Sequence, residues 1–159
     1  MNRAENQIIV IFGGRGDLAM RKIVPALYEL FIQGLMPERF AVLATGRSKI
    51  DDESYRNEVS SALTGKAGKE GGKGDDDFIR AFFYTTLDPL VPGDYLELAG
   101  LLNRLRSEMK IQGNTLFYLS VPPEIYDEIS PGLAGQGLNS EADGWKRLII
   151  EKPFGYDYA

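Results

Sequence analysis

The stretch from Ile8 to Lys22, IIVIFGGRGDLAMRK, limits most strongly what this chain can fold into. Its apolar run, Ile8–Phe12, is typical of a strand buried on both faces of a parallel sheet. The following turn is rich in glycine, which permits a sharp bend and a close approach to a ligand, at Gly13, Gly14 and Gly16. Asp17 and Leu18 then begin a helix, whose free N–H groups and positive dipole end face the turn. The combination predicts a phosphate site, most often for the pyrophosphate of a dinucleotide.

The glycine spacing alone does not decide between two interpretations. The pattern is G-G-x-G-x-x, not the full G-x-G-x-x-G fingerprint of dinucleotide-binding turns. A strand-to-helix turn that binds nothing therefore stays open at this point, and the rest of the chain has to discriminate.

Composition bounds the class of protein. The 159 residues suit a single domain, 1–159, with 43% hydrophobic and 26% charged residues. A net charge of −5 argues against non-specific binding to nucleic acid. The absence of cysteine fits the cytoplasm, and we expect neither a signal peptide at the polar start MNRAENQ nor a membrane segment. The chain also contains no histidine, which excludes an imidazole base or histidine metal ligand within it, and we expect no metal site.

Hydrophobic periodicity predicts alternating strands and helices. Strands are expected at Ile8–Phe12, Phe40–Thr45, Ala81–Thr85, Thr115–Val121 and Leu148–Ile150, the last beginning near Trp145. Helices are expected at 17–33, 51–63, 94–110 and 124–129. In the first, Pro25 should disturb the helix, and the residues expected to face the sheet are Ile23, Leu27, Leu30 and Phe31. Asp94 should cap the third, and Pro131 with Gly132 should end the fourth. This order predicts an α/β fold: a doubly wound, mostly parallel, Rossmann-like sheet in a three-layer α/β/α arrangement.

A glycine-rich segment interrupts the pattern at residues 65–77, GKAGKEGGKGDDD. It resembles a Walker phosphate loop superficially, but the spacing from Gly68 to Lys73 is one residue short and Gly74 replaces the Ser or Thr. It also follows no strand. We expect a flexible surface loop.

The carboxyl ends of the predicted strands indicate the ligand. Ligands of such sheets lie at these ends, which are Gly13–Gly16, Gly46–Ser48, Val121–Pro123 and Glu151–Lys152. After the second strand come Arg47 and Ser48, with no carboxylate until Asp51, and arginine at this position is typical of binding the 2′-phosphate of NADP. Six of the 18 Lys and Arg residues lie at or near these ends: Arg15, Arg21, Lys22, Arg47, Lys49 and Lys152.

Together these motifs resemble a known family. FGGRGDLAMRK with Pro25 in the helix, GRS after the second strand, LFYLSVPP and WKRLIIEKPFG are similar, in order and spacing, to the N-terminal NADP-binding domain of the glucose-6-phosphate dehydrogenase family. The resemblance implies oxidation of glucose 6-phosphate to 6-phosphogluconolactone by hydride transfer to NADP. It also implies a cytoplasmic oxidoreductase of glucose and carbohydrate metabolism, in the pentose phosphate pathway. The full-length protein would be a homo-oligomer, whereas the isolated domain can be monomeric.

The resemblance also implies roles for residues. The turn from Gly13 to Leu18 (Gly13, Gly14, Arg15, Gly16, Asp17 and Leu18) would cradle the pyrophosphate. Arg47 and Ser48 would hold the 2′-phosphate, and Lys22 matches the basic residue of the first helix. The nicotinamide ribose side would be lined by Tyr118, Val121 and Pro122. Lys152 matches the lysine that contacts the sugar and supports hydride transfer, and it counts among both the coenzyme-binding and the substrate residues.

This sequence departs from the family pattern in two respects. Arg15 stands where the family usually has Ser or Thr, so it would either reach around the phosphate or fold over the site. The family's second domain, with its large antiparallel sheet, catalytic histidine and most substrate-phosphate contacts, does not follow. We therefore expect this chain to bind NADP without turnover, either as a piece of a longer enzyme or as a natural truncated relative.

Two other functions compete with that interpretation. One is a standalone NADP-sensing or interaction module without catalysis, which an open reading frame continuing past Ala159 would refute. The other is a complete short-chain reductase, but that class needs a lysine four residues after the tyrosine, and Tyr118 is followed at that position by Pro122.

Overall fold

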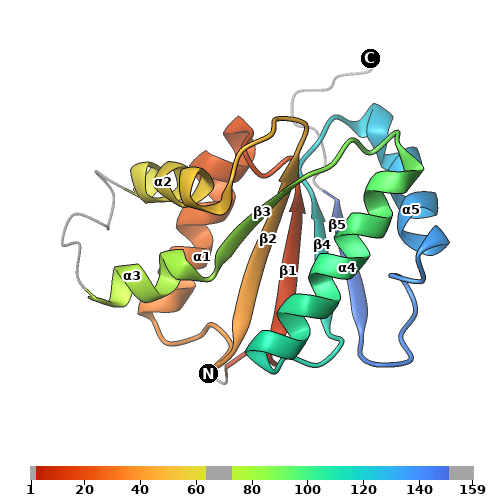
Figure 1. The fold of residues 1–159 in the computed structure, drawn as a ribbon. Helices are drawn as coiled ribbons and strands as arrows, with labels where there is room; N and C mark the ends of the chain where they lie inside the picture. The colour runs from red at the N-terminus through yellow and green to blue at the C-terminus, as the bar shows by residue number, and fades with distance from the viewer. Residues whose placement is uncertain (1–2, 64–72, 151–159) are drawn as a thin grey trace, which may run out of the picture.

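The computed structural model describes residues 3–63 and 73–150, in which five parallel strands form one sheet (Figure 1). The strand order is β3-β2-β1-β4-β5. Every pair of neighbouring strands is parallel, and the strands are β1 (Gln7–Phe12), β2 (Phe40–Gly46), β3 (Phe82–Thr86), β4 (Thr115–Leu119) and β5 (Lys146–Ile150). The chain winds outward from β1 to β3, then crosses back to β4, which is the reversal that defines a doubly wound sheet. The predicted Rossmann-like fold is confirmed.

The central strand β1 is buried along its whole length, as its apolar run predicts. Ile9 and Ile11 pack on one face of the sheet, whereas Ile8, Val10 and Phe12 pack on the other. This alternation follows from the two-residue period of a strand. Burial of both faces explains why the sequence of β1 is continuously apolar rather than alternating.

Helices cover both faces of the sheet and make three layers (Figure 1). On one face lie α1 (Val24–Ile32), α2 (Asp52–Leu63) and α3 (Lys73–Arg80), and on the other lie α4 (Pro92–Met109) and α5 (Tyr126–Gly135), preceded by the short helix η3 (Pro123–Ile125). None of the helices within residues 3–63 and 73–150 has the length and apolarity needed to cross a membrane.

The first helix contains a widened turn just before Pro25. After Asp17 and Leu18 the chain forms a π-helix, η1 (Ala19–Ile23), in which the N–H of Val24 donates to the carbonyl of Ala19. Proline lacks an N–H and its ring clashes with the carbonyl four residues earlier in a regular α-helix. The wider π-turn relieves that clash, so the predicted disturbance at Pro25 is a local change of helix type.

One residue of the predicted sheet-facing stripe of this helix lies elsewhere. Ile23 is buried, and Leu27 and Phe31 pack against the same core. Leu30, in contrast, is exposed, so its assignment to the stripe was wrong. The buried residues of α1 are Val24 and Tyr28, so the core-facing side of the helix is centred on them and Leu30 falls outside it.

The predicted loop at 65–77 ends earlier than expected. Residues 64–72 lie outside the described part, but Lys73–Arg80 forms α3, so assigning residues 73–77 to the loop was wrong. Asp75 and Asp76 occupy the first turn, where negative charge stabilises a helix dipole. Phe78 is buried against Tyr28 of α1, with ring centroids 5.3 Å apart. This tertiary contact supports a helix whose sequence, KGDDDFIR, contains a glycine and three aspartates.

Helix α5 continues past the residues expected to end it. Pro131 lies inside the helix, and Ile129 and Leu133 are buried one turn apart on its inner face. Gly132 allows the close packing, because a Cβ atom there would lie 2.3 Å from Cζ of Tyr95 on α4. Burial against α4 therefore outweighs the hydrogen bond that proline removes.

The start of α4 also differs from the prediction. The N-cap is Val91, followed by Pro92, so Asp94 is not the cap. The Asp94 carboxylate instead accepts the N–H of Asp88 at 2.8 Å, in the loop that leads from β3 into the helix. Proline suits the first helical position because its missing N–H would be unpaired there in any case.

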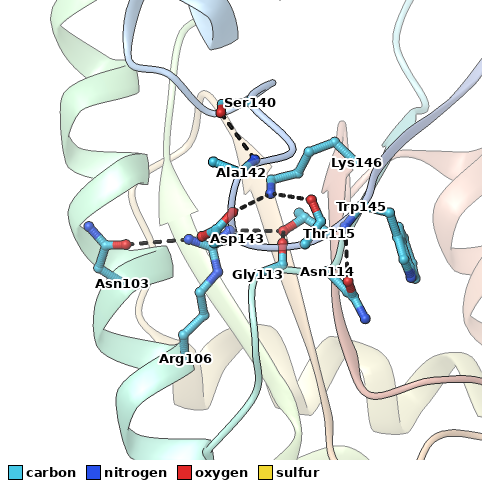
Figure 2. Close-up of polar contacts among 11 residues, drawn as sticks. Asn103, Arg106, Gly113, Asn114, Thr115, Ser140, Ala142, Asp143, Trp145 and Lys146 are labelled. Carbon is cyan, nitrogen blue, oxygen red and sulfur yellow. Dashed lines mark hydrogen bonds and ion pairs between the residues drawn. The ribbon is translucent and has the colours of Figure 1, made fainter.

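A polar cluster holds the loop before β5 against the start of β4 (Figure 2). The nearly buried Lys146 Nζ donates to Asp143 Oδ1 at 2.9 Å and to the Gly144 carbonyl at 3.2 Å. This contact lowers the pKa of Asp143. Arg106 of α4 donates from Nη2 to Thr115 Oγ1 at 2.9 Å, and burial lowers its pKa. The cluster fixes where β5 begins relative to β4.

The two edge strands, β3 and β5, differ in how they are covered. On the β3 edge, Arg56 Nε of α2 donates to the Phe82 carbonyl at 2.8 Å, and the N–H of Tyr84 donates to Asp52 Oδ1 at 2.8 Å. Side chains of α2 thus occupy backbone groups that would otherwise pair with another strand. The β5 edge instead carries partly exposed apolar side chains at Leu148, Ile149 and Ile150.

Leu102 on the inner face of α4 tests this packing. Its side chain is 0% exposed, whereas Leu96 on the same helix is 62% exposed. We expect Leu102→Ala to lower the free energy of unfolding by about 2–5 kcal/mol, because it leaves a cavity in the core. Leu96→Ala is the control, with an expected change within about 0.5 kcal/mol. Urea unfolding followed by circular dichroism measures both, and equal effects would contradict the packing described.

Candidate functional site

The glycine turn after β1 is held between the ends of β2 and β4. The N–H groups of Gly13 and Gly14 both donate to the carbonyl of Thr45 at the end of β2, each at 3.0 Å. On the other side, the N–H of Ser120 donates to the carbonyl of Phe12 at 2.8 Å. The turn therefore lies at the point where the strand order reverses, the position at which doubly wound sheets bind ligands.

Two of its glycines are required by close packing. Gly13 has a φ of +82°, and a Cβ atom there would lie 2.1 Å from the carbonyl oxygen of Ser120. A Cβ atom on Gly14 would lie 2.4 Å from Cβ of Ala44. Any side chain at these positions would push the turn away from β2 and β4. The glycines thus bring the backbone, and whatever binds it, close to the strand ends.

The helix that follows directs its free N–H groups to the same point. The N–H of Gly16 donates to the Gly13 carbonyl, and the N–H of Met20 donates to the Gly16 carbonyl, both at 3.1 Å. The second bond is the first of the intrahelical type, so the N–H groups of Asp17, Leu18 and Ala19 precede the helical ladder. Free N–H groups and the positive end of the helix dipole make a ready site for a phosphate or other anion.

Two buried tyrosines, which sequence reasoning missed, support the loops of this site. Tyr55 of α2 donates its hydroxyl to the Gly14 carbonyl at 2.9 Å, and Tyr84 of β3 donates to the Ser48 carbonyl at 2.6 Å. Their ring centroids are 5.4 Å apart, and burial raises the pKa of both hydroxyls. The helical spacing of Tyr55 with Val59 indicates burial, but no sequence signal reveals that its partner is Gly14.

Arg15, inside the turn, is tied to α2. Its Nε donates to Glu58 Oε1 at 3.0 Å and its Nη2 donates to Glu58 Oε2 at 2.7 Å. The bidentate contact raises the pKa of Arg15. The structure has neither of the two poses expected from the sequence: the side chain is turned toward α2. Glu58 was not among the predicted site residues, because 43 positions separate the two residues in the sequence.

Arg47 and Ser48 follow β2, as predicted, next to the glycine turn. The Arg47 side chain is 63% exposed, and its Nε lies 3.9 Å from Asp88 Oδ1. Asp88 of the loop after β3 thus supplies a nearby carboxylate that the sequence near β2 does not contain. Asp51 is engaged elsewhere: its Oδ1 accepts the N–H of Ser54 at 2.8 Å, which caps α2 and lowers the pKa of Asp51.

Further predicted residues lie on the β4 side of the turn. Lys22 and Tyr118 line a groove of about 350 Å³ between the first helix and β4–β5, together with apolar residues that include Leu116 and Ile149. Val121 is adjacent to the turn, because a Cβ atom on Gly13 would lie 3.0 Å from its Cγ1. Pro122 precedes η3 and is exposed. Lys152 lies outside the described residues.

A larger hollow, of about 450 Å³, lies at the amino ends of the strands, opposite the glycine turn. It is lined by residues just before β1, β2 and β4, among them Arg3, Arg39, Lys110 and Asn114. One of its lining residues, Lys110, is the C-cap of α4, so a helix C-terminus, with the negative end of its dipole, adjoins this hollow. The carboxyl edge, where the turn is clamped, is therefore the candidate site.

A parallel doubly wound sheet with a clamped glycine turn and an open helix N-terminus at its switch point defines a dinucleotide-binding domain. The family model described as "Glucose-6-phosphate dehydrogenase, NAD binding domain" matches residues 10–159. The chain therefore belongs to the glucose-6-phosphate dehydrogenase family, as the resemblance of its motifs predicted.

Individual relatives agree with this assignment. Glucose-6-phosphate 1-dehydrogenase of Aggregatibacter actinomycetemcomitans is 43% identical over 157 residues, covering 98% of this chain and 31% of that protein. The Bacillus subtilis enzyme of the same name is 40% identical over 156 residues, again covering 31% of that protein. A solved structure titled "Glucose-6-phosphate dehydrogenase in complex with its substrate glucose-6-phosphate" superposes with a TM-score of 0.84 at 30% identity, over 99% of this chain and 32% of that chain. The chain spans about a third of the length of these relatives.

The buried hydroxyl of Tyr55 predicts a weakening of the fold at high pH. Its pKa in the folded protein is raised above the ordinary value of 10.0, so the unfolded chain releases this proton first as the pH rises. The resulting stability is complete below about pH 10 and decreases above it, by up to about 1.4 kcal/mol per pH unit. We expect a shallower decrease in Tyr55→Phe than in the unmutated chain. Urea unfolding at pH steps from 8 to 12 measures the two slopes, and equal slopes would refute this role of Tyr55.

Proposed function

We propose that this chain is the coenzyme-binding part of an NADP-dependent glucose-6-phosphate dehydrogenase, which oxidises glucose 6-phosphate to 6-phosphogluconolactone. The observation that carries the proposal is the glycine turn, which is clamped against Thr45 and Ser120 with the helix N-terminus open behind it. Membership of the family supports the reaction as a whole, and the geometry of the turn supports coenzyme binding as the part of the reaction that this chain performs.

The turn is suited to the pyrophosphate of the coenzyme. Gly13 and Gly14 let the turn pack tightly against Ser120 and Ala44, and the N–H groups of Asp17, Leu18 and Ala19 precede the helical ladder just after the turn. The bound coenzyme would supply the hydride acceptor, and the residues of this chain would bind and orient it. Close backbone contacts of this kind hold a phosphate without any titratable group.

We infer a preference for NADP over NAD from the end of β2. NAD sites usually place a carboxylate there to accept from the ribose 2′-hydroxyl, whereas Arg47 and Ser48 occupy the position in this chain. Asp51 is the nearest acidic residue along the chain, but it caps α2. Arg47 is largely exposed, and its Nε lies 3.9 Å from Asp88 Oδ1, a long contact that leaves the guanidinium able to bind a phosphate with two nitrogens.

The nicotinamide end would lie on the β4 side. Tyr118, Val121 and Pro122 are placed there by β4 and the start of η3, and Lys22 lines the groove with Tyr118. By family resemblance, Lys152 would contact the sugar during hydride transfer. The proton of the reacting hydroxyl also needs a base, and this chain contains no histidine. We therefore propose that the chain binds coenzyme but does not by itself reduce NADP.

Coenzyme titration tests the role of Arg47. By calorimetry we expect the chain to bind NADP more tightly than NAD, and Arg47→Ala to remove most of the difference. A charge-assisted contact to phosphate contributes about 1.5–3 kcal/mol, roughly a ten- to hundredfold change in affinity. Arg104→Ala is the control, since it removes the same charge from an exposed side chain of α4. Equal affinity of the unmutated chain for the two coenzymes would refute the assignment of Arg47.

A further inference from the structure

Two arginines follow the neighbouring strands β1 and β2 at the carboxyl edge of the sheet. Phe12 of β1 pairs with Thr45 of β2. Arg15 lies three residues after Phe12, and Arg47 lies two residues after Thr45. Both are therefore on the adenosine side of the proposed dinucleotide site, where the second strand ends. A coenzyme phosphate on the adenosine ribose would thus have two guanidinium groups in its neighbourhood.

The two arginines differ in how strongly carboxylates engage them. Within the described part of the chain, the ion pair of Arg47 is a distant one, with Nε 3.9 Å from Asp88 Oδ1. Arg15 is held in a bidentate pair by Glu58, at 3.0 and 2.7 Å, and the two side chains are only 34% and 35% exposed. The pair uses Nε and Nη2, which form one of the two-nitrogen edges with which a guanidinium can bind a phosphate bidentately.

Helix α2 also holds the backbone next to Arg15. Tyr55, three residues before Glu58, donates to the carbonyl of Gly14. The same face of α2 therefore fixes two consecutive residues of the turn, Gly14 through its backbone and Arg15 through its side chain. A helix anchored in this way keeps the Glu58 carboxylate in place, so Arg15 is not free to swing toward a ligand without losing both hydrogen bonds.

We propose that Glu58 is a positioning residue that limits the preference for NADP, because it withholds Arg15 from the phosphate on the adenosine ribose. The proposal rests on the proposed function and adds a residue that acts through another. Glu58 acts by occupying the Arg15 guanidinium and balancing its charge, so the pair attracts a nearby phosphate less than a released arginine would. NAD lacks that phosphate and is affected much less.

Substitution of Glu58 by glutamine provides the test. Calorimetric titration of Glu58→Gln should give NADP affinity roughly tenfold higher than in the unmutated chain, with a much smaller change for NAD. Glu53→Gln is the matched control, since it removes the same charge from an exposed position of α2. In the double variant Glu58→Gln with Arg15→Gln the gain should disappear, because the released arginine is then missing. Damage to the fold would weaken both coenzymes, so a gain for NADP alone distinguishes positioning from a structural role.

Three results would overturn the inference. They are unchanged NADP affinity in Glu58→Gln, an equal gain for NADP and NAD, and persistence of the gain in the double variant. An equal gain would place Arg15 on the pyrophosphate that the two coenzymes share. Failure of the proposed function would be visible separately, as absent binding or equal affinity for both coenzymes in the unmutated chain.

Discussion

The clamp on the glycine turn is the constraint on which the rest of the site depends. One carbonyl, that of Thr45, accepts both N–H groups of Gly13 and Gly14, and the Phe12 carbonyl accepts the N–H of Ser120. These bonds fix the turn against β2 and β4 at once, so the helix that follows can start in only one direction. Side chains larger than hydrogen at the two glycines would separate the turn from the strands. The direction in which the helix N-terminus points is therefore determined by backbone packing in the core.

Helix α2 extends this constraint outward. It binds the turn through Tyr55 and Glu58, covers the β3 edge through Arg56, and is itself capped by Asp51. The loop after β2, which carries Arg47 and Ser48, is held by Tyr84. Buried tyrosine hydroxyls and charged side chains of α2 thus together anchor the elements that carry the charged residues of the candidate site.

Sequence patterns predicted the sheet and most helices because burial dictates them locally. The continuous apolar run of β1 predicts a strand buried on both faces. The stripe of Leu98, Leu102 and Leu105 predicts the buried face of α4. The errors occurred where tertiary contacts outweighed local preference. Phe78 stabilises α3 in a glycine-rich segment, and the packing of Gly132 on Tyr95 carries α5 past Pro131. No local pattern contains those partners.

The candidate site divides in the same way. The positions of the turn residues and of Arg47 could be predicted because these residues follow strands. Glu58, Tyr55 and Asp88, in contrast, are distant in the sequence and make contacts that only the fold creates. The central claim, that a dinucleotide binds at the clamped turn, is tested most directly by amide NMR of the 159-residue chain during titration with NADP. The account predicts that the N–H resonances of Asp17, Leu18 and Ala19 shift most. Shifts concentrated instead at Lys110 and Asn114, beside the hollow at the opposite edge of the sheet, would contradict it.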